Sequence, residues 1–174
     1  MNDETEKRDN LIYEVVNSRY ALEEQRTCNL EQKAQNIISF VGIMLILQAG
    51  SVGLIINEIP KVDVFYIAFS LLYVLSIFNL ICSIYCSLKA YQVKKWILIP
   101  DTEYLIEEYA EKERNITDIL RILSVEISNA IKHNEKINDV KAKLIQYSLF
   151  FLTIGVGLIV ISTCSLLLVR MIII

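Results

Sequence analysis

The sequence has a single histidine, His133, only two prolines and five glycines. One histidine excludes catalytic triads, imidazole relays and metal centres built on several imidazole ligands. We expect a solvated His133, because it lies in the polar run KHNEKIND. The sequence also has no glycine-rich phosphate loop, no serine-centred elbow and no paired carboxylates in an apolar setting. These absences predict a protein that is not an enzyme.

A strong net charge is also missing, since the formal value is only -3. Nucleic-acid binding requires a strongly basic face, so a nucleic-acid polymer is not an expected partner. The polar, acidic first 35 residues do not match a signal peptide, which needs an apolar core. What the sequence does have is 54% hydrophobic residues and a mean hydropathy of +0.44. Because the charges concentrate in 1–35 and 89–143, this composition predicts membrane spans joined by water-exposed segments.

Three apolar stretches are long enough to span a bilayer, which takes about 20 helical residues. They cover 37–56, 64–88 and 147–169. The fold class expected is therefore an all-α membrane protein, with three transmembrane helices and long cytoplasmic helical extensions that form a stalk. In chain order, we expect a cytoplasmic amphipathic helix continuous with the first span (1–35), a transmembrane hairpin turning near Pro60 (36–88), a cytoplasmic helical segment (89–146) and a third transmembrane helix (147–174).

The distribution of basic residues predicts the orientation in the membrane. The turn between the first two spans holds one lysine, whereas the other two connecting segments hold most of the lysines and arginines. By the positive-inside rule, those two segments belong in the cytoplasm. The expected location is the cell inner (plasma) membrane, with the N-terminus inside and the C-terminus outside. Arg170 then either marks the outer interface by snorkelling or acts as a sensing charge.

Apolar residues recur at helical spacing in both cytoplasmic segments. The first stripe comprises Leu11, Val15, Ser18, Leu22 and Leu30, widened by Ile12 and Val16. The second comprises Ile116, Leu120, Leu123, Ile127, Ala130, Ile137 and Leu144, after a short helix that follows Pro100. Both helices run toward the bilayer, so we expect them to be parallel. The stripes should face each other or the stripes of neighbouring subunits in a coiled-coil homo-oligomer, because neither is stable alone in water.

Polar and small residues inside the spans are candidate sites. Gln48 and Asn79 are amides at membrane depth, and they either bond to each other within a subunit or line a polar seam at the centre of an oligomer. Glycines Gly50 and Gly53 are expected to mark a helix-packing face. Gly42, Ala49, Gly155 and Gly157 are expected to allow close helix packing in the same way.

Charged residues where the helices enter the inner headgroup layer form a second group of candidates, namely Glu31, Lys33, Lys141 and Lys143. Glu31 either pairs with Lys141 or Lys143, which ties the stalk to the spans, or these charges face lipid headgroups.

Lys89, Lys94, Lys95 and Trp96 follow the second span. This mixture of cations and an amphipathic ring is typical of an inner membrane interface, where the bilayer itself is the partner. A nucleotide-phosphate pocket built partly from these lysines is the alternative.

No metal or other cofactor is expected. Cys82 and Cys86 are four residues apart and share a helix face, but two thiols in an apolar span make an incomplete zinc shell.

The junction Glu31-Gln32-Lys33-Ala34 resembles the acid-x-Lys-Ala motif that opens the first span in the transmembrane effectors of bacterial cyclic-nucleotide anti-phage systems, the Pycsar group. The runs 129–131, 134–138 and 141–143 before the last span are similar to the same family. The resemblance implies antiviral defense, with a cyclic nucleotide binding the cytoplasmic helices and membrane integrity then being impaired. It assigns no ligand-contacting residue. A membrane scaffold, or a small channel subunit whose stalk recruits a cytoplasmic partner, is the alternative function.

Overall fold

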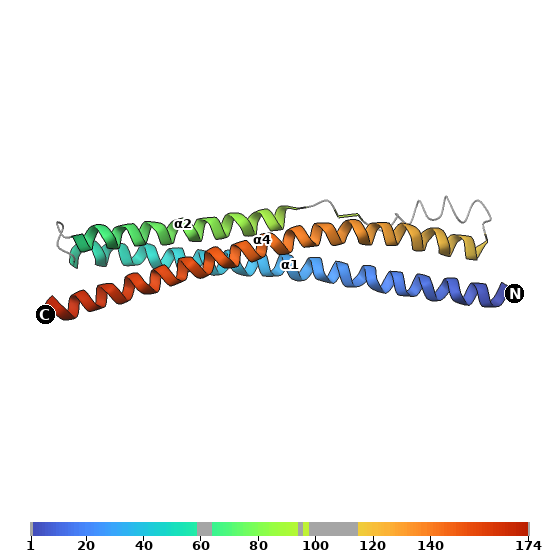
Figure 1. Cartoon of the computed structure of the whole chain (residues 1–174), viewed down its shortest axis with the longest axis horizontal. Helices are drawn as coiled ribbons and strands as arrows, with labels where there is room; N and C mark the ends of the chain where they lie inside the picture. Colours follow the sequence, from blue (N-terminus) through green and yellow to red (C-terminus); the bar gives the residue numbers. More distant parts are fainter. Residues whose placement is uncertain (1, 59–63, 94–95, 98–114, 174) are drawn as a thin grey trace. The chain divides into compact units, whose positions relative to one another are not determined.

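Three long α-helices make up the part of the chain that the computed structural model describes (Figure 1). They are α1 (Asn2–Glu58), α2 (Val64–Gln92) and α4 (Ile116–Ile173). The described backbone covers 2–58, 64–93, 96–97 and 115–173, and the described side chains cover 4–51, 67–93, 96–97, 115–165 and 167–168. The all-helical prediction is confirmed for these residues, and the three helices are long and apolar enough to cross a membrane.

The absence of proline within any of these helices accounts for their length. α4 begins where the backbone N–H groups of Asp118 and Ile119 donate to the carbonyl oxygen of Asn115, at N···O distances of 3.0 and 3.2 Å. Asp118 adds a negative charge to the first turn, where the helix dipole favours it. The expected turn at Pro60 and the short helix after Pro100 lie outside the described residues.

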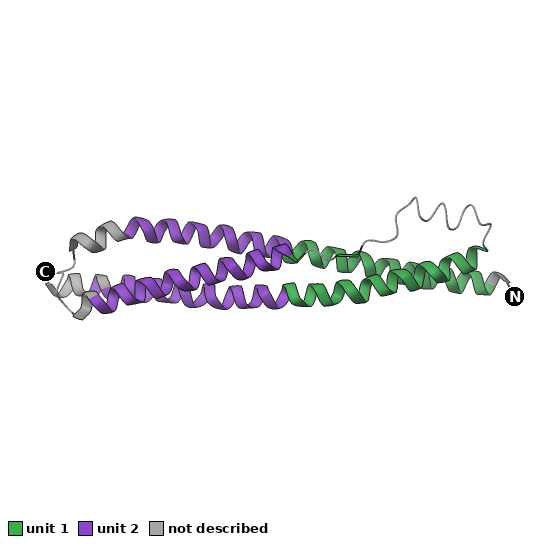
Figure 2. Cartoon of the chain, turned by 90° about the horizontal axis from the view of Figure 1, so that it is seen from above, with its two compact units in different colours: residues 1–30, 93–141 green, residues 31–92, 142–174 purple. Residues whose placement is uncertain are grey.

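The chain divides into two compact units (Figure 2). Unit 1 contains residues 1–30 and 93–141, and unit 2 contains residues 31–92 and 142–174. α1 and α4 therefore each contribute residues to both units, whereas α2 belongs to unit 2.

Within unit 1, α1 and α4 lie side by side and run in the same direction. Arg121 Nε donates to Asp9 at 2.8 Å, and Thr27 Oγ1 donates to Asn138 at 2.9 Å. The paired residues are separated by 112 and 111 positions, so the helices advance together along the chain. This is the parallel arrangement expected for these two helical segments.

The core of unit 1 is formed by Tyr20 on α1 and by Ile127, Ala130 and Ile131 on α4. Of the apolar stripe expected on α1, Val16 packs against this core. Leu11, Val15 and Leu22 are instead 61%, 60% and 64% exposed. The expectation that the two stripes face each other within one chain is therefore wrong for most of the stripe on α1. The face that α1 turns toward α4 carries polar and aromatic residues that form hydrogen bonds there.

In unit 2 small polar side chains are buried and large apolar side chains are exposed, which is the reverse of the pattern in a water-soluble protein. Its fully buried side chains include the hydroxyls of Ser76, Ser83, Ser87 and Ser148. Its large aliphatic and aromatic side chains are mostly exposed, among them Ile43, Ile46, Leu47, Ile67, Leu71, Val74, Phe78, Ile81, Phe150, Val160, Ile161, Leu167 and Leu168. A helical unit solvated by water would expose the serines and bury the leucines. Small polar residues between helices and apolar residues outside are typical of helices packed in lipid.

Candidate functional site

The side-chain amide of Asn134 clamps one peptide group in unit 1. Asn134 Oδ1 accepts the backbone N–H of Ile97, and Asn134 Nδ2 donates to the carbonyl oxygen of Ile97, both at 3.0 Å. Asn134 is fully buried on α4, so both ends of its amide are satisfied away from water. Ile97 lies five residues beyond Gln92, where α2 ends. The clamp thus fixes the chain that follows α2 onto the helix pair of unit 1.

Two aromatic rings complete this site, which we call the Ile97 clamp (Tyr20, Trp96, Ile97 and Asn134). The Tyr20 hydroxyl donates to the Ile97 carbonyl oxygen at 3.2 Å, and Trp96 Nε1 donates to the Tyr20 hydroxyl at 3.3 Å. The two ring centroids are 6.2 Å apart, with planes tilted by 57°. Trp96 packs against the core of unit 1 and is the only tryptophan in the sequence. The fluorescence emission of Trp96 therefore reports on whether the clamp is closed.

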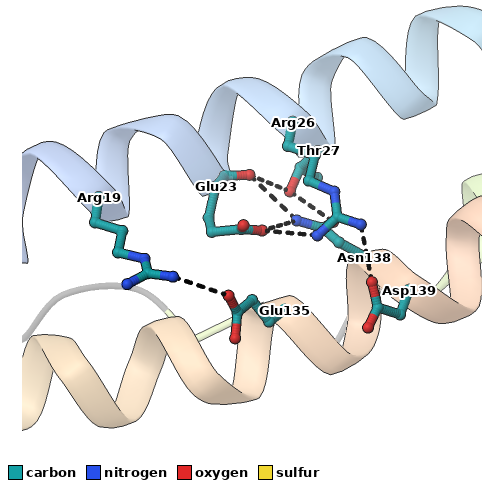
Figure 3. A network of polar contacts seen from close by, with 7 residues as sticks. All are labelled: Arg19, Glu23, Arg26, Thr27, Glu135, Asn138 and Asp139. Atoms are coloured by element: carbon teal, nitrogen blue, oxygen red, sulfur yellow. Dashed lines mark hydrogen bonds and ion pairs between the residues drawn. The ribbon is translucent and has the colours of Figure 1, made fainter.

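One turn further along α4, Asn138 is the centre of a polar network that joins the two helices (Figure 3). Asn138 Nδ2 donates to the Glu23 carboxylate at 2.8 Å, while its Oδ1 accepts from Thr27. Arg26 donates to Asp139 at 2.8 Å, and this bond raises the pKa of the Arg26 guanidinium above its usual value. Arg26 therefore stays protonated at physiological pH. A buried asparagine that is satisfied in only one register fixes the alignment of a helix pair.

At the start of unit 1, Asp9 is buried although its partners are largely solvent-exposed. Its carboxylate accepts from Arg121 Nε at 2.8 Å and from Arg8 at 3.2 Å. Charge-assisted hydrogen bonds of this kind contribute about 1.5–3 kcal/mol when buried. The contribution here is smaller, because both arginines remain in contact with water.

Asp9→Asn is expected to lower the free energy of unfolding of unit 1 by about 1 kcal/mol, because it removes the charge that Arg121 binds. Denaturant titration followed by circular dichroism measures the change. Glu24→Gln is the matched control, since Glu24 is exposed on the same helix. Equal effects of the two substitutions would contradict the role assigned to the Asp9–Arg121 pair.

In unit 2, Gln48 joins α1 to α2. Its side-chain amide donates to the Ser76 hydroxyl and to the Tyr73 carbonyl oxygen, and the Tyr73 hydroxyl donates to the Gln48 backbone carbonyl. Asn79 makes a different contact, since its Nδ2 donates to Leu75 O in its own helix at 2.8 Å. The expected Gln48–Asn79 bond is therefore not formed. Gln48 is buried within one chain, which favours its role as an interhelical bond over pore lining.

α2 and α4 meet at a second polar contact, the serine cluster (Ser83, Ser87 and Ser148). The Ser148 hydroxyl is 2.9 Å from Ser83 Oγ and 2.7 Å from Ser87 Oγ, and it also donates to the Ser83 carbonyl oxygen. Two turns further along α4, a Cβ on Gly155 would lie 2.9 Å from Leu80 Cδ2. The contacts pair earlier α2 residues with later α4 residues, so the two helices are antiparallel within this unit.

The other glycines that were expected to pack do not approach a neighbouring helix closely. A Cβ at Gly42, Gly50 or Gly157 would meet no atom within 4 Å. Gly50 therefore does not form the expected close helix contact within one chain. Gly53 lies outside the residues whose side-chain environment the structure describes.

The charged residues expected at the membrane junction have differing environments. Glu31 is half-buried in unit 2, where Lys33 and Lys143 are exposed. Lys141 is buried in unit 1 and continues the buried α4 face of Asn134 and Asn138. The pairing of Glu31 with Lys141 or Lys143 stays a prediction.

Of the residues expected at the inner interface, Lys89 is exposed in unit 2, with Nζ 6.0 Å from the centroid of the Tyr85 ring. Lys94 and Lys95 lie outside the described residues, as does the side chain of Arg170. Trp96 bonds to Tyr20 and packs against the core of unit 1, whereas the sequence predicted that it would anchor in lipid.

Sequence reasoning missed Asn134 and Asn138, which lie in the polar run KHNEKIND beside the histidine expected to be solvated. The spacing of the buried positions on α4 could have indicated them. Positions 127, 131, 134, 138, 141 and 145 alternate by four and three, so the helical stripe continues through polar residues. Apolar periodicity alone could not reveal it.

The described residues contain no group of three histidine, cysteine or acidic side chains able to hold a metal ion. Cys82 and Cys86 are free and half-buried in α2. Neither a protein-family model, nor a curated protein, nor a solved structure matches this chain. The geometry of the Ile97 clamp is therefore the basis for its proposed role.

Proposed function

We propose that this protein is a non-enzymatic, oligomeric inner-membrane effector of anti-phage defense, which impairs membrane integrity when unit 1 senses a cyclic nucleotide. The inverted burial of unit 2 supports the membrane part of the proposal, because serines lie inside and large apolar residues outside. In this proposal unit 2 spans the bilayer, and unit 1 with the N-terminus lies in the cytoplasm.

The observation that carries the sensing step is the Ile97 clamp. Asn134 binds an adjacent donor and acceptor, which is also the pattern that nucleobase edges present. The rings of Trp96 and the buried Tyr20 lie next to it, and in this proposal a base would stack on them once the Ile97 peptide has left. A cyclic nucleotide that takes the place of the Ile97 peptide on Asn134 would release the chain that follows α2. The ligand acts only if it binds the released state more tightly than the clamped state.

The polar contacts of unit 2 support a closed resting state. Gln48 Nε2, Ser76 and the serine cluster form hydrogen bonds with neighbouring side chains and backbone within the chain, whereas Gln48 Oε1 is buried without a partner among the described residues. Hydrogen bonds between helices in membranes contribute only about 0.6 kcal/mol on average, so such contacts can exchange when the helices move. In this proposal the contacts keep the membrane-spanning helices closed until the ligand binds. The damage to the membrane is then regulated, unlike the leak through an always-open channel.

Dye release from liposomes that contain the purified protein tests the proposal. Cyclic pyrimidine nucleotides are expected to increase release, whereas linear nucleotides of the same bases are not. Asn134→Ala is expected to release dye without nucleotide, because Ile97 loses both of its hydrogen bonds to Asn134. Asn129→Ala, at an exposed position on the same helix, is the control and should behave like the natural protein. No nucleotide-dependent release with an intact oligomer would contradict the effector function.

A membrane scaffold or small channel subunit remains the second candidate, because the stripe on α1 leaves Leu11, Val15 and Leu22 exposed. A stalk that recruits a cytoplasmic protein would use such a surface. This candidate predicts no nucleotide response, and a channel predicts dye release under every condition.

A further inference from the structure

The exposed face of α1 in unit 1 has the spacing of a coiled-coil seam. Leu11, Val15, Ser18 and Leu22 are all exposed and follow one another by four, three and four residues. This is the alternation of d and a positions in a heptad repeat. Ile12, which is 45% exposed, flanks the seam and widens it. We call these four positions the α1 stripe.

The α1 stripe lies opposite the surface that α1 uses within the chain. Asp9, Tyr13, Val16, Tyr20 and Thr27 contact α4 or pack against the core of unit 1. In the same heptad these residues occupy only b and f positions, on the far side of the helix from a and d. α4 therefore does not cover the α1 stripe, and α1 can pair with a second helix without disturbing the first.

We propose that the α1 stripe is the seam along which two copies of this chain pair, with their α1 helices parallel and in register. The direction rests on the membrane part of the proposed function, because two copies inserted in one bilayer with the same orientation present their α1 helices in the same direction. Like positions then face each other, with Leu11 on Leu11 and Ser18 on Ser18 of the second copy.

The charges beside the α1 stripe fit the same arrangement. Glu14 occupies a g position, and Arg19 occupies the e position five residues later. In a parallel, in-register pair, each Glu14 lies beside Arg19 of the second copy. Both are exposed, and Arg19 has only a loose contact with Glu135, at 3.8 Å. A partner helix without a cation at this place would lack the ion pair, so a second copy fits better than an arbitrary apolar helix.

The seam is short, and this fits a membrane-bound protein. Fewer than two heptads of apolar contact do not hold a dimer of free helices in water. Attachment to one bilayer confines the copies and raises their effective concentration, as a linker does between two binding modules. The seam therefore brings the cytoplasmic units together only after membrane insertion.

Disulfide trapping in vesicles tests this proposal. In a Cys28→Ser background, which removes the exposed thiol of α1, Leu11→Cys and Ser18→Cys are introduced separately. Both are expected to convert most of the protein to a covalent dimer under mild oxidation. The two positions are about 10 Å apart along the helix, so an antiparallel pair would trap at most one of them. Asn17→Cys, which is exposed on another face, is the control and should stay monomeric.

Adding Val15→Glu to either cysteine variant is expected to abolish the dimer band, because two carboxylates would face each other in the seam. Failure of both cysteines to cross-link in protein with native Trp96 emission would overturn the proposal, as would trapping at only one position. Dye release measured on the same vesicles separates the two proposals. Nucleotide-dependent release without cross-linking would overturn the seam alone, whereas cross-linking without release would support the seam and count against the effector function.

Discussion

Asn134→Ala is expected to release the chain after α2 from unit 1 and to move the emission of Trp96 to longer wavelength. The substitution leaves the N–H of Ile97 without its only described partner and removes one of two partners of the Ile97 carbonyl oxygen. Because Ile97 is 44% exposed, its freed N–H can bond to water, and the expected loss is the net value of an ordinary hydrogen bond, about 0.5–1.5 kcal/mol. Trp96 is bonded to Tyr20 next to this peptide, so it becomes exposed when the clamp opens. Steady-state fluorescence measures the change without a label.

The control for this prediction is Asn129→Ala on the exposed side of α4, which should leave the emission unchanged. Tyr20→Phe should produce a smaller shift in the same direction, because it removes one bond to Ile97 and keeps the ring. An Asn134→Ala protein with natural Trp96 emission and natural stability would show that apolar packing alone holds the segment, and the clamp would lose its role.

Gly155→Val is expected to destabilise unit 2 by about 1–3 kcal/mol, the usual cost of adding atoms to a filled contact. A Cβ at this position would lie 2.9 Å from Leu80 Cδ2 and 3.1 Å from Leu80 Cγ. Leu80 is fully buried, so it has little room to move aside. We expect α2 and α4 to separate locally. Titration with a denaturing detergent, followed by circular dichroism, measures the loss.

Gly157→Val is the matched control, because a Cβ there meets no atom within 4 Å. Both substitutions replace a helical glycine by the same residue, so the change in helix propensity is equal and cancels in the comparison. If the two variants were equally stable, the close approach of α2 and α4 at Gly155 would be wrong.

The helices of this protein could be predicted from its sequence, because their signals are local. Uncharged apolar stretches of sufficient length and the lack of proline within the helices determine them, and basic residues on either side suggest an orientation. The parallel course of α1 and α4 also followed from chain direction. These inferences needed no knowledge of which side chains meet.

The contacts could not be predicted in the same way. The apolar periodicity of α1 identified the stripe that is exposed, whereas the face toward α4 is chosen by the hydrogen bonds of Asp9 and Thr27 and by the packing of Tyr20 in the core. The partners in those two bonds are 112 and 111 positions away in the sequence. The contact of Asn134 was likewise not predicted, because its partner is the backbone of Ile97, which carries no signal in the sequence.

The most direct test of the account is to follow Trp96 emission and dye release in the same vesicles during titration with a cyclic pyrimidine nucleotide. Both signals are expected to change over the same range of nucleotide concentration, because the proposed ligand would replace the Ile97 peptide on Asn134 and thereby trigger dye release. A Trp96→Phe protein supplies the fluorescence background. Dye release with constant Trp96 emission would contradict the account, because the membrane would then respond without opening of the Ile97 clamp.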